Sequence, residues 1–210
     1  MQPKKLKYRI LIIVLLLGSF SALCFFRINN LDSGIELNCY YFLAQFINPY
    51  LTKIMRLLTR IGDVYGLIII IFVILIIPKF RWQYGIFLAC SVFLSAYLNS
   101  ILKIFFMKER PNILRLIPIS GYSFPSAHAM NNATLYLLMI FLVSRSVRNK
   151  NIKFFVTSLC YFLLFTISLS RIYLGVHTFN DVISGWLLGA VIAIIFDTIH
   201  QYFIKTPLAN

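Results

Sequence analysis

Long apolar stretches separated by short polar segments make up most of this chain. A segment that crosses a bilayer as a helix needs about 20 consecutive, mainly apolar residues. Six stretches meet or approach that length, so the pattern predicts an all-α membrane protein with six transmembrane helices. They cover residues 9–26, 62–78, 82–102, 127–144, 153–170 and 182–203. The second is the shortest, and Pro78 is expected to end it because proline lacks the amide donor and clashes with the preceding turn.

The pattern changes between the first and second predicted spans. Between residues 51 and 60, apolar residues recur at helical spacing, and Lys53, Arg56 and Arg60 lie between them. A helix with one apolar and one basic face lies in the headgroup plane of a membrane and does not cross it. This interfacial helix either packs over the bundle or guides an anionic substrate, and the pattern alone allows both.

The composition agrees with a membrane protein. Of 210 residues, 60% are hydrophobic and 12% are charged, which is unlike a soluble domain. The first apolar stretch follows a basic cluster, as in a signal peptide. Because later stretches are equally apolar and no cleavage site precedes a soluble domain, we predict an uncleaved first span. No repeat or linker is visible, and a single domain over residues 1–210 is the simplest prediction.

The net charge of +14 indicates anionic partners. The basic residues lie in short segments between spans, so the bilayer and lipid phosphates are the expected partners and nucleic acid is not. Basic residues cluster before the first span and between residues 145 and 153, which predicts that both termini are cytoplasmic. The segments after the third and fifth spans then share the outer face.

The outer segment between the fifth and sixth spans carries Arg171, His177 and Asp181. His177 and Asp181 are four residues apart, which places them on one face if a helix begins near His177. A carboxylate beside a histidine fixes its tautomer and stabilises its charged form. A polar loop between membrane helices could also carry these residues without any catalytic role.

The outer segment after the third span contains Lys103 and Arg110, followed by Pro111. Lysine offers a compact charge and arginine a planar fork, and both suit phosphate oxygens. The alternative is that these cations simply extend from a helix end to the membrane surface.

The same connection then leads through Ser126, Ala127 and His128 into the fourth span. Ser126 is expected to cap that helix, which leaves the first amides available to an anion. A histidine placed there could protonate a leaving oxygen. A capped helix with an interfacial histidine is the simpler alternative.

Together these segments resemble the three-part signature of the type 2 phosphatidic acid phosphatase superfamily. The resemblance rests on Lys103-x6-Arg110-Pro111, Pro125-Ser126-Ala127-His128 and Ser170-Arg171-x5-His177-x3-Asp181, in that order within residues 103–181. It implies a membrane enzyme that removes the terminal phosphate from a lipid phosphate or diphosphate. One departure is Ala127, where the signature usually has glycine. Alanine keeps the amide but adds a methyl group, which reduces the room around a phosphate.

The resemblance also implies the role of each residue. His177 would be the nucleophile that forms a phosphohistidine, Asp181 would orient it, and His128 would protonate the leaving group. The implied phosphate-binding residues are Lys103, Arg110, Ser126, Ala127 and Arg171. No metal or other cofactor is implied, because these cations supply positive charge and the sequence contains no carboxylate cluster suited to magnesium.

Several substrates and alternative functions remain open. The signature concerns the phosphate and not the lipid tail, so phosphatidylglycerophosphate, phosphatidic acid and undecaprenyl diphosphate are all candidates, and a lipid A phosphatase is an alternative. Resemblance to small bacterial members implies the bacterial inner (cytoplasmic) membrane, with the site on its periplasmic or extracellular face. The related vanadium haloperoxidases are soluble, unlike this chain. A non-enzymatic lipid-binding or transport protein would be expected to carry paired broken segments, which are not visible.

Some polar residues lie within predicted spans. Asp197, in the last span, is predicted to have a structural or interfacial role near the cytoplasmic end. Asn99, Asn131 and Asn132 are predicted to form hydrogen bonds between helices.

Overall fold

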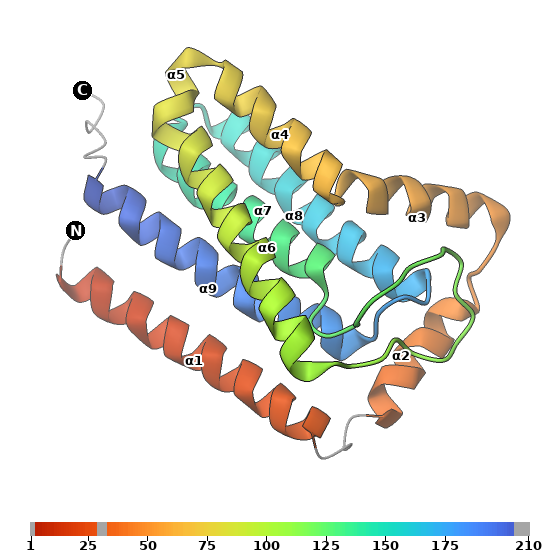
Figure 1. Ribbon diagram of the computed structural model, residues 1–210. Coiled ribbons are helices and arrows are strands. Elements are labelled where there is room, and N and C mark those ends of the chain that lie inside the picture. Colours follow the sequence, from red (N-terminus) through yellow and green to blue (C-terminus); the bar gives the residue numbers. More distant parts are fainter. Residues whose placement is uncertain (1–2, 29–32, 204–210) are drawn as a thin grey trace.

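The computed structural model describes residues 3–28 and 33–203. Over these ranges the chain is helical and has no strand, as the apolar pattern predicted (Figure 1). The elements are α1 (Pro3–Ile28), α2 (Ser33–Ala44), α3 (Pro49–Ile61), α4 (Val64–Ile76), α5 (Pro78–Phe80), the π-helical turn η1 (Arg81–Gly85), α6 (Ile86–Phe106), α7 (Ala127–Ser146), α8 (Lys150–Tyr173) and α9 (Phe179–Phe203). The long helices form a bundle, and α3 turns away from its end.

Within the described residues, five helical segments are long and apolar enough to cross a membrane. They are Lys4–Ile28, Pro78–Phe106, Ala127–Ser146, Lys150–Tyr173 and Phe179–Phe203, and each contains one predicted span. The remaining predicted span, the second at 62–78, corresponds to α4. Its 13 residues extend about 20 Å, which is shorter than a hydrocarbon core about 30 Å thick. Helices α3 and α4 are bent by 52° relative to each other, and the pair counts as a sixth crossing only if both helices are taken as one span. The protein is therefore polytopic, and the count of six is approximate.

Two helix boundaries differ from the apolar pattern for identifiable reasons. Asn149 Oδ1 accepts hydrogen bonds from the amides of Asn151 (2.9 Å) and Ile152 (3.2 Å), so α8 begins three residues before the predicted span. Pro78 follows the end of α4, as predicted, but it also begins α5, and α5, η1 and α6 continue as one long segment. A first-turn proline is tolerated because the donor it lacks would have no partner there.

The predicted amphipathic helix is α3, and it covers the end of the bundle near the signature segments. Asn48 caps it by accepting a hydrogen bond from the Leu51 amide at 2.9 Å. Leu51 and Met55 pack against the buried cluster that contains Tyr173 and Val176. The basic residues of α3 remain exposed: Lys53, Arg56 and Arg60. The helix therefore packs over the bundle with its apolar face and presents its basic face outward.

Helices α7 and α9 approach each other closely because α9 carries glycines at the contact. A Cβ atom at Gly189 would lie 2.5 Å from the carbonyl oxygen of Met130, and one at Gly185 would lie 2.8 Å from that of Ser126. Small residues allow membrane helices to pack backbone to backbone. This contact places the start of α9 beside the start of α7, and both starts carry signature residues.

The three asparagines predicted to bond between helices all bond to another segment of the bundle, but only Asn131 does so helix to helix among the bonds that follow. Asn99 Nδ2 donates to the carbonyl of Pro125, just before α7, at 3.1 Å. Asn131 Oδ1 accepts from a serine of α6 at 2.7 Å. Asn132 Nδ2 donates to the carbonyl of Gly62 at 2.8 Å, which fixes the bend between α3 and α4 to α7.

Asp197 lies buried at the opposite end of the bundle, where α1 begins and α9 ends (Figure 1). Arg145 Nη1 and Gln201 Nε2 each donate to Asp197 Oδ2 at 2.9 Å, and Arg9 forms a further ion pair with the carboxylate. The carboxylate therefore joins α1 and α7 to α9, in agreement with its predicted structural role.

Candidate active site

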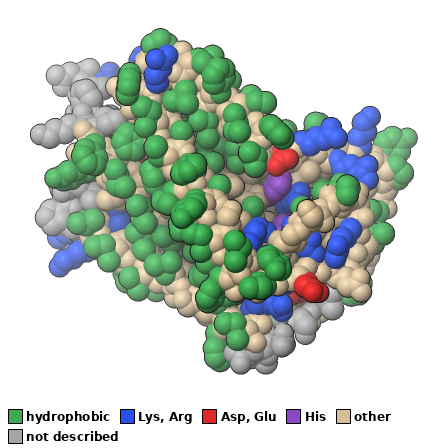
Figure 2. Space-filling view, in the orientation of Figure 1, with side chains coloured by type: hydrophobic (Ala, Val, Ile, Leu, Met, Phe, Trp, Pro, Cys, Tyr) green, Lys and Arg blue, Asp and Glu red, His purple; other side chains and the backbone are tan. Residues whose placement is uncertain are grey.

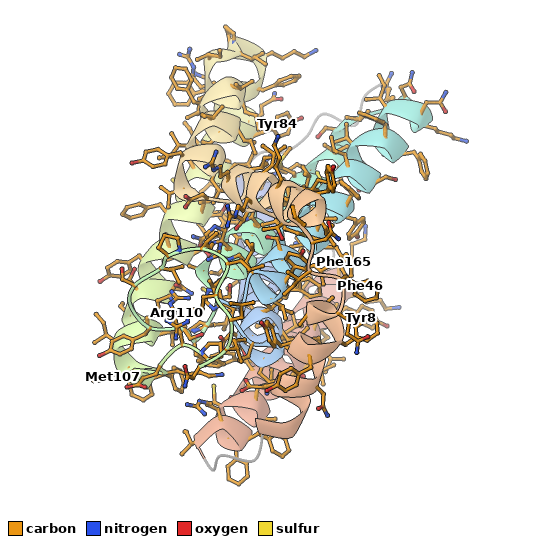
Figure 3. The ribbon with its side chains drawn as sticks, turned by 90° about the vertical axis from the view of Figure 1, so that its right-hand side faces the viewer. Tyr8, Phe46, Tyr84, Met107, Arg110 and Phe165 are labelled. Atoms are coloured by element: carbon orange, nitrogen blue, oxygen red, sulfur yellow. The ribbon has the colours of Figure 1, made fainter. Side chains whose placement is uncertain are left out.

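The signature segments meet around a cavity of about 250 Å³ at the end of the bundle covered by α3. Figure 2 shows the hollow, with histidine atoms inside it and Lys and Arg atoms around it. Figure 3 looks onto this end and places Arg110 in the loop that follows α6. The signature residues that line the cavity are Lys103, Arg110, Ala127, His128, Arg171 and His177. Ser126 and Asp181 lie fully buried behind the cavity wall.

His177 lies between a carboxylate and a guanidinium. Its Nδ1 is 3.3 Å from Asp181 Oδ2, and its Nε2 is 3.4 Å from Arg110 Nη1. Burial lowers the pKa of His177 to about 3, although Asp181 acts in the opposite direction. The imidazole is therefore neutral near neutral pH. With its proton on Nδ1, facing Asp181, it directs the Nε2 lone pair toward the cavity.

Asp181 is held by donors on both carboxylate oxygens. The Thr178 amide donates to Oδ2 at 3.0 Å, and the Ser123 hydroxyl donates to the same oxygen. Lys108 Nζ donates to Oδ1 at 2.9 Å. The backbone carbonyl of Asp181 accepts a hydrogen bond from the Ser126 amide at 3.0 Å. Asp181 is thus fixed to both the loop before α7 and the loop before α9.

Lys108 and Glu36 belong to this network, and sequence reasoning did not identify either one. Lys108 is 5% exposed, and its Nζ donates to Glu36 Oε1 at 2.8 Å and to Thr178 Oγ1 at 3.1 Å. Glu36 comes from α2 and also accepts from Thr178 Oγ1 at 2.6 Å. Glu36 could have been singled out because the chain contains only six acidic residues. Its partner Lys108 lies 72 positions away in the sequence, so the pairing itself could not be predicted.

Arg110 is positioned by backbone carbonyls of its own loop and of the connection between α8 and α9. Its Nε donates to Gly121 O at 3.0 Å in its own loop, and its Nη1 donates to Val176 O at 2.7 Å in the other connection. Burial lowers the pKa of Arg110. Lys103 Nζ donates to the carbonyl of Tyr122, so the loop after Ser120 holds both cations at the rim of the cavity.

Arg171 is a buried cation with unused donors. It is 2% exposed, and its Nη1 donates to Thr59 Oγ1 of α3 at 2.6 Å. Its Nε and Nη2 atoms are buried without a hydrogen-bond partner. Leaving a buried charged donor unpaired is costly, and a guanidinium fork matches the oxygens of a phosphate. An anion in the cavity would satisfy these donors.

His128 and Ser126 lie at the capped start of α7. The Ser126 Oγ accepts from the Ala129 amide at 3.5 Å, which confirms the predicted cap. The hydroxyl therefore bonds the helix start and does not line the cavity. His128 lines the cavity and forms a hydrogen bond with the Thr59 backbone. The site thus contains a neutral histidine backed by a carboxylate, a second histidine, and three cations.

The chain is similar to known lipid phosphate phosphatases. Over 148 residues it is 30% identical to phosphatidylglycerophosphatase B of Bacillus subtilis, covering 69% of this chain and 72% of that protein. Over 178 residues it is 32% identical to a dihydrosphingosine 1-phosphate phosphatase of Schizosaccharomyces pombe, covering 72% of this chain and 43% of that protein.

Two solved structures share the fold. The crystal structure of a transmembrane PAP2-type phosphatidylglycerolphosphate phosphatase from Bacillus subtilis aligns with a TM-score of 0.82 and 26% identity, covering 92% of this chain and 98% of that one. Aquifex aeolicus LpxE aligns with a TM-score of 0.63 and 24% identity, covering 81% and 96%. Residues 84–205 match the PAP2 superfamily, and the chain therefore belongs to this superfamily of membrane phosphatases.

Proposed function

We propose that this protein removes the terminal phosphate from a lipid phosphate or diphosphate through a phosphohistidine on His177. The observation that supports this most strongly is the position of His177, whose Nε2 faces a cation-lined cavity while its Nδ1 faces Asp181 at 3.3 Å. A neutral imidazole oriented by a carboxylate is an activated nucleophile. The lipid phosphatase relatives support the reaction class.

In the first step, His177 Nε2 attacks the terminal phosphorus. A P–N bond forms and the P–O bond to the leaving group breaks. His128 enters this step protonated and donates its proton to the departing oxygen, and it regains a proton in the second step. Lys103, Arg110 and Arg171 hold the non-bridging oxygens, on which charge accumulates in the transition state. The Ala127 amide is a further donor at the cavity wall. Ser126 contributes by fixing the start of α7, because its hydroxyl caps the helix.

In the second step, water replaces the histidine. His128 accepts a proton from the attacking water, a P–O bond forms, and the P–N bond breaks to release phosphate and neutral His177. We propose that this chemistry needs no metal, since three cations line the cavity. Among residues 3–28 and 33–203, no group of three or more His, Cys, Asp or Glu is placed to bind a metal ion.

The proposed substrates are phosphatidylglycerophosphate, phosphatidic acid and undecaprenyl diphosphate, because the cavity lies at the end of the membrane bundle, where lipid phosphates are located. Purified protein assayed against this panel tests the proposal. Wild type is expected to release phosphate from at least one of these lipids, and His177→Ala is expected to release none. Full activity of His177→Ala would contradict the mechanism.

We also propose that the cavity faces the periplasm or cell exterior and that both termini are cytoplasmic, with residues 1–210 acting as one domain in the bacterial inner membrane. The basic clusters near Arg9 and Arg145 lie at the end away from the cavity, as an inward-facing end requires. Ser120→Cys, in a variant whose four native cysteines are replaced, should react with an impermeant thiol reagent in intact cells. If the introduced cysteine reacted only after lysis, the cavity would face the cytoplasm and the proposed orientation would be wrong.

A further inference from the structure

A second cavity of about 440 Å³ adjoins the candidate active site. It lies between α3 and the loop over residues 116–119. The charged and polar residues that line it are Arg56, Thr59, Arg60, Asp63, His128 and Arg171. Neither Arg56 nor Arg60 lines the first cavity, so the proposed phosphoryl-transfer step leaves both without a role.

The two cavities share a wall that includes His128 and Arg171. In the proposed function, which this inference extends, the phosphoryl group is attacked by His177 from the first cavity. His128 protonates the departing oxygen, so the leaving group lies on the His128 side. His177 does not line the second cavity. The leaving group would therefore enter the space beside Arg56 and Arg60.

The charge of the second cavity favours an anionic leaving group. Arg56 and Arg60 are four residues apart on α3, which places them on one helix face. The Arg56 Nη2 donates to Leu116 O at 2.6 Å, and this bond holds the guanidinium beside the loop. Asp63 is the single acid in the lining, and its Oδ1 accepts from the Val64 amide at 2.7 Å. Positive charge therefore predominates.

Arg171 supplies donors without partners at the shared wall. Its buried Nε and Nη2 have no hydrogen-bond partner, and one phosphate in the first cavity need not satisfy both. A guanidinium can bridge two neighbouring anionic groups through separate edges of its fork. The arrangement suits two phosphates, one on each side of Arg171.

We propose that the second cavity binds a second phosphate, carried by the leaving group, through Arg56, Arg60 and Arg171. The enzyme would then favour lipids with two phosphates over phosphatidic acid, which has one. The second phosphate could be the inner phosphate of a lipid diphosphate or the phosphodiester of phosphatidylglycerophosphate. Both present the same anionic oxygens.

Binding of small phosphonates to the full-length protein in detergent tests this subsite without requiring turnover. Titration calorimetry would compare methylenediphosphonate with methylphosphonate for wild type, the Arg56→Gln/Arg60→Gln double variant and Arg60→Gln alone. The double variant should weaken methylenediphosphonate binding by about tenfold or more and methylphosphonate binding by less than about threefold. Arg60→Gln should shift binding in the same direction, and it leaves the Arg56 bond to the loop intact.

Lys53→Gln is the matched control, because Lys53 is a cation of the same helix that does not line the second cavity. It should leave the ratio of the two phosphonate affinities unchanged. Equal weakening of both phosphonates in the double variant, or an equal effect of Lys53→Gln, would show general electrostatic attraction and overturn the subsite.

Hydrolysis then identifies the source of the second phosphate. In the double variant, kcat/KM should fall about tenfold or more for the preferred two-phosphate lipid and less than about threefold for phosphatidic acid. If kcat/KM falls more for undecaprenyl diphosphate, the second phosphate is the inner phosphate of a diphosphate. If it falls more for phosphatidylglycerophosphate, the second phosphate is a phosphodiester. If wild type hydrolysed no lipid, the proposed function would fail, while the phosphonate comparison would still decide the subsite.

Discussion

Lys108 Nζ lies 2.9 Å from Asp181 Oδ1, and both side chains are buried behind His177. The same ammonium group lies 2.8 Å from Glu36 Oε1. Lys108 therefore sits between two carboxylates and links α2 to the residue that orients the proposed nucleophile. The hydrogen bond between His177 and Asp181 depends on this arrangement because it fixes which way the Asp181 carboxylate faces.

Replacing Lys108 by methionine should damage both stability and activity. Glu36 and Asp181 would remain buried without their shared cation, and breaking a buried ion pair costs about 3–5 kcal/mol. We expect a lower melting temperature and a fall in kcat of about tenfold or more, with a smaller change in KM. Thermal unfolding in detergent and steady-state phosphate release measure these effects.

Lys79→Met serves as the control, because Lys79 is exposed and lines a different cavity. The Glu36→Gln/Lys108→Met double variant should lose less stability than the sum of its single variants, since it removes both charges together. Additive losses would mean that Lys108 and Glu36 act independently.

The pH dependence of stability should report the buried neutral state of His177. Its pKa in the folded protein, about 3, lies below the unfolded value of about 6.5. The unfolded chain therefore binds more protons between these values, and His177 lowers stability as pH falls from about 6.5 toward 3. The melting temperature of wild type should fall more between about pH 7 and pH 4.5 than that of His177→Asn. Equal falls would indicate that His177 titrates normally.

The close contact of α7 and α9 should not tolerate a side chain at Gly189. A Cβ atom there would lie 2.5 Å from Met130 O and 2.6 Å from Ala133 Cβ. Gly189→Val should force the helices apart at a cost of about 1–3 kcal/mol and reduce activity by separating the starts of α7 and α9. Gly18→Val is the control, because nothing lies within 4 Å of a Cβ atom at Gly18. Equal melting temperatures for the two variants would contradict this account.

Ala127 tests the room around the proposed phosphate. It lines the cavity at the first position of α7. Ala127→Gly keeps the amide and should retain kcat/KM within about threefold, whereas Ala127→Val should lower it by restricting the cavity. Phosphate release by the two variants provides the measurement. Greater activity in the valine variant than in the glycine variant would show that cavity size is not limiting.

The apolar pattern predicted the helical class and the positions of five spans because length and hydropathy are properties of each segment by itself. The pattern did not show that α4 is shorter than a full span. A 13-residue helix and a span that is broken at Gly62 give similar hydropathy. The pattern also did not foresee that Pro78 would begin the next helix. Such boundaries depend on caps and on how neighbouring helices pack.

The signature residues could be predicted because their types and spacing follow a known pattern, and six of them do line one cavity. Lys108 and Glu36 could not, because their pairing requires α2 to fold against the loop after α6. Ser126 was predicted both to cap α7 and to belong to the phosphate-binding residues. The cap is confirmed, and the contact with phosphate stays a prediction.

The central claim is that phosphate passes through His177. The most direct measurement is rapid acid-free quenching of full-length enzyme during turnover of a lipid phosphate, followed by mass spectrometry of the peptide that contains residues 172–181. The account predicts a phosphorylated peptide, with the phosphate on His177 and none in His177→Gln. A wild-type enzyme that turns over substrate and carries phosphate on another residue, or on none, would contradict it.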